Sequence, residues 1–155
     1  MTPAQKRATA LALATAIAIP AEGLRQAAYR DPVGIATVCF GTTAGVKMGD
    51  YRTLDQCKAL LSRDMLAAVT TVEQCARREL TAPQTAAFAD AVYNIGPTIV
   101  CNTDMSTLAR KLQAGDVAGA CNQLPRWDKA NVAGIMVPLP GLTKRRAAEQ
   151  ALCLS

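Results

Sequence analysis

The sequence predicts an α+β fold that is mainly helical, with one small antiparallel β-lobe. Half of the 155 residues are apolar but only 4% are aromatic, and alanine, the strongest helix former, dominates. From Thr53 onward, apolar residues recur at helical spacing behind two capping boxes. Between residues 28 and 50, glycines and β-branched residues are typical of short strands joined by turns. The length suits one domain with a cleft between two lobes, which is the natural ligand site.

The chain begins with a basic and then apolar segment. Lys6 and Arg7 precede an apolar run, rich in alanine and threonine, from Ala8 to Ala21. This order is typical of an export signal, but the run is shorter than the roughly 20 residues that span a bilayer comfortably. Folded, the segment would be a first helix whose apolar packing comes from Leu11, Leu13, Ile17 and Ile19.

Two acids and a hydroxyl follow this segment as Glu22, Asp31 and Thr37. One short helix cannot place both acids on the same face, so the chain must turn back between them. Asp31-Pro32-Val33-Gly34 provides that turn, with Asp first, Pro second and Gly fourth in a type I turn. Two carboxyl groups held across a small cleft are what the cleavage of a glycosidic bond requires.

The predicted β-lobe covers about residues 28–50. Its apolar stretch, Ile35–Phe40, is β-branched and aromatic, and four glycines punctuate the region. We expect a hairpin or three short strands. Strand alternation would place Thr37 and Cys39 on one face and Val38 and Phe40 on the other.

The predicted helical lobe covers about residues 53–155. Thr53 and Thr81 each open a capping box with a glutamine three residues later. Because glycines and prolines are frequent between residues 129 and 141, we expect an irregular connection there. Shorter helices are expected over 105–114, 116–124 and 143–154.

Charge and composition narrow the function classes. The net charge of +5 suits an anionic partner, but no nucleic-acid-binding module is present, so nucleic acid is not expected. With no histidine and no CxxC pair, we expect no zinc or other metal and no histidine-activated nucleophile. Six widely spread cysteines indicate disulfides and an oxidising compartment, in any of fifteen pairings. We expect a monomer without a cofactor.

These residues resemble the phage-type lysozymes, glycoside hydrolase family twenty-four. Glu22, Asp31 and Thr37 have the Glu-x8-Asp-x5-Thr spacing of that family's catalytic residues. The resemblance covers about residues 17–155, and Thr42 departs from it because many members have histidine there. Further landmarks occur in the family's order: Tyr93-Asn94-Ile95-Gly96, Ser106-Thr107-Leu108, Trp127 and Gly141-Leu142-x-x-Arg145-Arg146-x-x-Glu149.

The resemblance implies an endolysin that hydrolyses the β-1,4 bond between N-acetylmuramic acid and N-acetylglucosamine in peptidoglycan during host cell lysis. Glu22 would donate a proton to the glycosidic oxygen, which requires partial burial. Asp31 would stabilise positive charge on the sugar and orient water, and Thr37 would help hold that water. The family also implies inversion at the sugar, with a wide separation of the carboxyl groups.

Four further residues are candidates for support of this site. Arg145 or Arg146 would contact Glu22 and fix its side chain. Asn94 and Thr107 are candidate sugar contacts. Each also has a purely structural explanation, with Asn94 as a helix C-terminal residue and Thr107 as a helix N-cap.

The resemblance extends to a signal-anchor-release subclass of these enzymes. Residues 1–21 would export the enzyme to the host periplasm and tether it to the inner membrane through about residues 3–21. On release they would become the N-terminal helix of a catalytic domain spanning 22–155. Because the segment runs directly into Glu22, insertion in lipid would displace that acid. The resemblance also implies the disulfides Cys39–Cys57 and Cys121–Cys153, and with them Cys75–Cys101.

Two alternative functions remain open at the level of sequence. A lytic transglycosylase cleaves the same bond without water, but it typically relies on one glutamate, so Asp31 and Thr37 argue against it. A non-catalytic murein-binding or membrane-disrupting protein would explain the basic charge. Anhydro-muropeptide products would identify the first, and activity that survives Glu22→Gln would identify the second.

Overall fold

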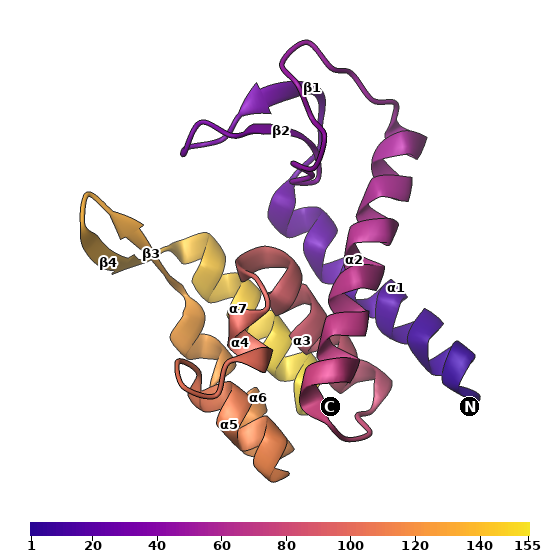
Figure 1. Cartoon of the computed structure of the whole chain (residues 1–155), viewed down its shortest axis with the longest axis vertical. Helices are drawn as coiled ribbons and strands as arrows, with labels where there is room; N and C mark the ends of the chain where they lie inside the picture. The colour runs from indigo at the N-terminus through magenta and orange to yellow at the C-terminus, as the bar shows by residue number, and fades with distance from the viewer.

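A computed structural model describes residues 1–155 and confirms the mainly helical α+β fold. Figure 1 shows the β1–β2 hairpin at one end of the molecule and helices α5 and α6 at the other, with the long helix α2 between them. In chain order the elements are α1 (Pro3–Glu22), β1 (Arg25–Arg30), β2 (Ala36–Cys39), α2 (Leu54–Ala76), α3 (Ala82–Ile95), α4 (Thr98–Cys101), α5 (Thr107–Ala114), α6 (Val117–Cys121), the 3-10 helix η1 (Leu124–Trp127), β3 (Lys129–Val132), β4 (Ile135–Pro138) and α7 (Pro140–Cys153).

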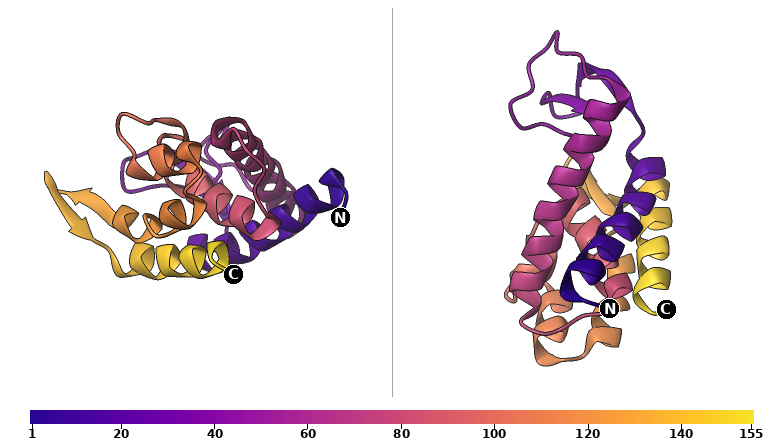
Figure 2. Two further views of the ribbon diagram at one scale, coloured as in Figure 1. Left: turned by 90° about the horizontal axis from the view of Figure 1, so that it is seen from below. Right: turned by 90° about the vertical axis from the view of Figure 1, so that its right-hand side faces the viewer.

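Helix α1 packs through alanines. Ala10, Ala14 and Ala18 recur every four residues and are fully buried, while Ile19 remains 40% exposed. The expectation that Ile19 packs in the core is therefore wrong, because small side chains form the contact face and let α1 approach α3 closely. No helix in the structure combines the length and the apolar character that crossing a membrane requires. Figure 2 shows α1 beside both α2 and α7.

The β-lobe is a two-stranded antiparallel sheet. Tyr29 pairs with Thr37, and an isolated bridge between Ala27 and Tyr51 adds a third piece of chain. All four residues from Thr37 to Phe40 are buried, so both faces of this stretch are covered. Cys39 has a φ of +63°, which breaks the strand geometry at that residue.

Three disulfides connect the elements, and they are the three expected pairs. Cys39–Cys57 fastens the β-lobe to α2, so the position of the hairpin is fixed relative to the long helix. Cys75–Cys101 joins α2 to α4, and Cys121–Cys153 joins α6 to α7. No cysteine is free.

The helical lobe contains a second hairpin where an irregular connection was expected. β3 and β4 pair in register around Ala133 and Gly134, whose φ values are +52° and +85°. Two successive positive φ values are typical of a type I′ turn, which usually carries Asn-Gly. Here Asn131 Oδ1 accepts a hydrogen bond from the Gly134 amide at 2.8 Å. Because Ala133 stands where asparagine is usual, the sequence did not indicate this turn. In Figure 2 this hairpin extends away from the helices.

Both predicted capping boxes are confirmed, at Thr53 for α2 and at Thr81 for α3. The last helix begins three residues before its expected start, at Pro140, because proline is well suited to the first helical turn. Helix α3 lies at the centre of the lobe and contacts α1, α2 and α7, so it can present side chains to each of them.

Candidate active site

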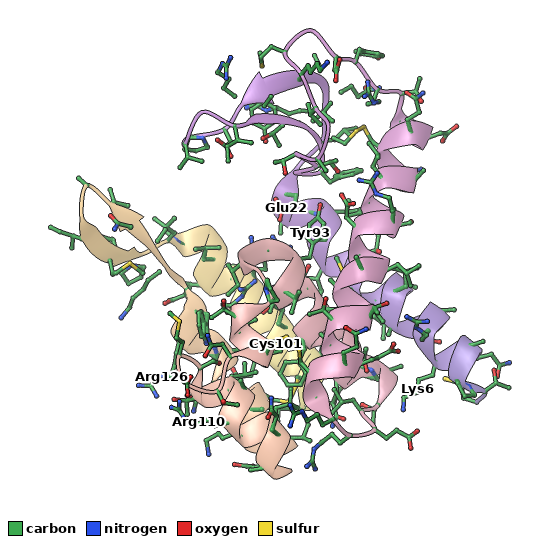
Figure 3. All side chains as sticks on the ribbon, in the orientation of Figure 1. Lys6, Glu22, Tyr93, Cys101, Arg110 and Arg126 are labelled. Atoms are coloured by element: carbon green, nitrogen blue, oxygen red, sulfur yellow. A yellow bond between two sulfur atoms is a disulfide. The ribbon has the colours of Figure 1, made fainter.

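Glu22 is the last residue of α1 and lies where the two lobes meet. Gly23 follows it with a φ of +71°, which ends the helix and directs the chain into β1. The Glu22 side chain is 21% exposed. A methyl group placed on Gly41, after β2, would lie 3.3 Å from Glu22 Oε2, so the β-lobe backbone approaches the carboxyl group closely. Figure 3 shows Glu22 next to Tyr93 at this junction.

Arg145, on α7, is the arginine that contacts Glu22. Its Nη1 donates to Glu22 Oε1 at 2.5 Å, and its Nε and Nη2 both donate to Asp90 at 2.8 Å. Asp90, on α3, is fully buried. Burial by itself lowers the pKa of Arg145, but the hydrogen bonds and charges of Asp90 and Glu22 outweigh it and raise that pKa.

Arg146 contacts a different pair of residues, deeper in the helical lobe. Its Nη2 donates to Asn94 Oδ1 at 3.0 Å and to Glu149 Oε1 at 2.5 Å. Burial, followed by a hydrogen bond with Asp90, raises the pKa of Glu149 to about 10. Asn94 is in the last turn of α3, so the structural explanation applies to it, although it also lines the pocket at Glu22 described below.

Tyr93 connects α3 to the β-lobe. Its hydroxyl donates to the backbone carbonyl of Phe40, the residue before Gly41. Burial, with the charge of Glu22 next, raises the pKa of Tyr93, so this hydroxyl is a donor throughout the physiological pH range. The hydrogen bond fixes the backbone that faces the Glu22 carboxyl group.

Asp31 and Thr37 lie at the turn end of the β1–β2 hairpin. Asp31 Oδ1 accepts the amides of Val33 and Ile35 at 3.0 and 2.8 Å, and the Gly34 amide donates to the Asp31 carbonyl, as in the predicted turn. Thr37 is 3% exposed, and its hydroxyl donates to the Ile35 carbonyl. No hydrogen bond joins Asp31 or Thr37 to Glu22. The structure therefore places both residues on the β-lobe, where their hydrogen bonds are made within the hairpin and not with the glutamate.

Two pockets contain candidate residues. A pocket of about 600 Å³ lies between the end of α1 and the start of α7, and Glu22, Asn94 and Arg145 line it. A separate pocket of about 470 Å³ contains Thr107 together with Trp127. The structural explanation offered for Thr107 is wrong, because Ser106 caps α5, while the Thr107 hydroxyl accepts from Arg110 at 2.7 Å.

Sequence reasoning did not identify Asp90, the Tyr93 hydroxyl or Gly41 as parts of the site. Asp90 did leave a signal, because it is the only charged residue in an alanine-rich helix that is otherwise largely apolar. A buried acid needs a buried cation, and Arg145 and Arg146 were available. Gly41 left no such signal, since its proximity to Glu22 depends on how the lobes pack.

Comparison with known proteins identifies clear relatives. A sequence model of the family described as Phage lysozyme matches residues 20–149. The SAR-endolysin of Pseudomonas phage phiKMV is 38% identical over 148 residues, which cover 96% of this chain and 90% of that protein. The active form of the P1 phage endolysin Lyz superposes with a TM-score of 0.79 at 28% identity, over 92% of this chain and 83% of that one.

The same P1 endolysin has also been solved in a form described as secreted and inactive. That form superposes less well, with a TM-score of 0.53 at 28% identity over 72% of this chain and 74% of the other. Taken as a whole, this chain is therefore more similar in structure to the active form than to the secreted inactive form.

Proposed function

Because the chain belongs to the phage lysozyme family, whose members are glycoside hydrolases that act on peptidoglycan, we propose that Glu22 and Asp31 carry out hydrolysis of the β-1,4 bond between N-acetylmuramic acid and N-acetylglucosamine. The observation that supports this proposal best is the environment of Glu22. Its half-buried carboxyl group is held by Arg145 and lies against the backbone at Gly41. A carboxyl group fixed in this way at the wall of a pocket is suited to general acid catalysis.

In the proposed reaction Glu22 protonates the glycosidic oxygen as the bond to the leaving sugar breaks. Asp31, whose carboxylate is oriented by two backbone amides, stabilises the positive charge that develops on the sugar ring and orients the attacking water. Thr37 lies on the same hairpin as Asp31 and would hold that water. No hydrogen bond joins the two acids, and the proposal, which follows the family, is inversion at the sugar with the attacking water between them.

The experiment compares Glu22→Gln with wild-type protein on purified Gram-negative sacculi. Glu79→Gln is the matched control, because Glu79 is 89% exposed and lies at the opposite end of α1, where it pairs with Lys6. Loss of a general acid costs about 10²–10⁴-fold in rate, so Glu22→Gln should be nearly inactive while Glu79→Gln retains wild-type activity. Equal activity of all three proteins would exclude an acid role for Glu22.

The products separate hydrolysis from the transglycosylase alternative. Mass analysis of the released muropeptides should show hydrated reducing ends, whereas anhydro ends would contradict the proposed use of water. NMR of the first products, recorded before the anomers equilibrate, reports inversion or retention directly.

We propose further that residues 1–21 export the catalytic domain, residues 22–155, to the host periplasm and hold it at the inner membrane until release. Relatives described as SAR-endolysins support this proposal. The alanine- and threonine-rich composition supports it too, because insertion of such residues in lipid is only weakly favourable. After release, the same residues would form α1 and place Glu22.

Ala8 and Ala12 allow a test of the membrane step, because both are exposed on α1 and away from the buried alanine face. Leucine at both positions raises the apolar character of the segment without touching the packing against α3. The double variant should remain in the membrane fraction and delay lysis, while the purified protein cleaves sacculi at the wild-type rate. If wild-type protein never enters the membrane fraction and lysis by the variant is not delayed, the tether does not exist.

A further inference from the structure

The buried guanidinium of Arg145 has two partners with different tasks. Two of its donors, Nε and Nη2, form parallel hydrogen bonds with the two oxygens of Asp90, each 2.8 Å long. The third, Nη1, is directed to Glu22. Arg145 and Asp90 are 5% and 0% exposed, whereas the Glu22 side chain is 21% exposed. Asp90 therefore binds the arginine on its buried side, and Glu22 contacts it on the side that faces the pocket.

We propose that Asp90 is a positioning residue of the active site. It holds Arg145 so that the remaining donor of the arginine fixes the carboxyl group of Glu22. It also offsets the positive charge that Arg145 would otherwise exert on Glu22. This inference rests on the proposed acid role of Glu22. Asp90 itself has no exposure to the pocket and touches no substrate.

The geometric part of the argument follows from the shape of the guanidinium group. Its five donors are planar, and a bidentate carboxylate fixes both the position and the plane of the group. With that plane fixed, the direction of Nη1 is fixed as well. Without Asp90, the long Arg145 side chain would regain rotamer freedom, and Glu22 would lose the contact that holds it.

The electrostatic part concerns the proton that Glu22 must donate. A cation beside a carboxyl group favours its ionised form, and an ionised Glu22 cannot act as an acid. Asp90 contributes a negative charge on the other side of the same guanidinium and offsets this effect. The other titratable or charged groups that face this cluster are Tyr93 from α3, and Arg146 and Glu149 from α7.

The test measures kcat/KM on soluble muropeptide chains between pH 4 and 9 for wild type and Asp90→Asn. Asparagine keeps the size of the side chain but removes its charge. We expect the alkaline limb of the profile to move to lower pH by about one unit, and activity at pH 7 to fall about tenfold. Asp104→Asn is the control, because it makes the same charge change at an exposed aspartate of the α4–α5 loop and should leave the profile in place.

Asp90→Glu tests separately whether the position of the Asp90 carboxylate matters. It also tests the proposal if Asp90→Asn does not fold. It keeps the charge but displaces the carboxylate by one methylene, so the pH limb should stay in place while kcat falls about tenfold. A folded Asp90→Asn protein with the wild-type profile overturns the proposal, and so does Asp90→Glu with wild-type kcat. A merely structural role would lower stability in both variants without moving the limb.

Failure of this inference is distinguishable from failure of the proposed function. If Glu22→Gln is inactive and the Asp90→Asn profile is unchanged, the acid role stands and Asp90 has no positioning role. If Glu22→Gln is active, the acid role itself is wrong.

Discussion

Replacement of Gly41 by alanine tests how closely the β-lobe backbone must approach the catalytic candidate. Gly41 has a φ of +96°, and its new methyl group would lie 3.3 Å from Glu22 Oε2 and 3.8 Å from the Tyr93 hydroxyl. The first distance is shorter than an ordinary van der Waals contact. Glu22 cannot simply withdraw, because Arg145 holds its other oxygen at 2.5 Å. The substitution therefore combines backbone strain with displacement of the carboxyl group.

Gly49 provides a matched control for the strain. Its φ is +97°, and a methyl group there would meet nothing within 4 Å. An L-residue in this region of the Ramachandran plot costs about 1–2 kcal/mol. At 2–4 °C for each kcal/mol in a chain of this size, both variants should lose about 2–8 °C in Tm, and by similar amounts.

Activity should separate the two variants. A misplacement of about 1 Å can cost about 10²-fold in rate, so a shift of a few tenths of an ångström in Glu22 should cost about three- to tenfold. Initial rates of turbidity loss of sacculi at 25 °C, far below both Tm values, measure this effect. Gly49→Ala should match wild type. If Gly41→Ala also matches wild type, the close approach seen at Glu22 has no part in catalysis.

Three other perturbations have expected outcomes. Tyr93→Phe removes the hydroxyl that donates to Phe40 and should lower the free energy of unfolding by about 1–3 kcal/mol; an unchanged urea midpoint contradicts this. Serine at both Cys75 and Cys101, which close a loop of sequence separation 26, should cost about 3–4 kcal/mol, and a loss below about 1 kcal/mol would refute it. Burial raises the pKa of Glu149 to about 10. The folded state therefore keeps a proton that the unfolded state releases above about pH 4.5. As a result, this group lowers the free energy of unfolding progressively as the pH rises from about 4.5 to about 10. Glu149→Gln should therefore flatten the decline of unfolding free energy between pH 5 and 9, and parallel curves for the two proteins would show that Glu149 does not titrate there.

The parts of the fold that local sequence determines were predictable. Thr53 and Thr81 predict the starts of α2 and α3, because a capping box is formed by two residues that are three positions apart in the sequence. The turn at Asp31 was equally visible, because its hydrogen bonds lie within five residues. The β3–β4 hairpin was not visible, because Ala133 occupies a positive-φ position where asparagine or glycine is usual.

The candidate site was only partly predictable, for a different reason. Glu22, Asp31 and Thr37 are recognisable by their spacing, and the arginine pair by its place on the last helix. The local sequence does not determine that Arg145, rather than Arg146, faces Glu22. Neighbouring residues on a helix point about 100° apart, so the packing of α7 against the other helices decides between them. The partnership of Asp90 with Arg145 also depends on tertiary packing.

The hydrogen bond from Arg145 to Glu22 joins residues 123 positions apart. Because translation proceeds from the N-terminus, Glu22 is made before Arg145. While the residues between them are being added, the acid exists without the arginine that fixes it. The contact that fixes Glu22 therefore cannot form until α7 has been made and has packed against the rest of the helical lobe.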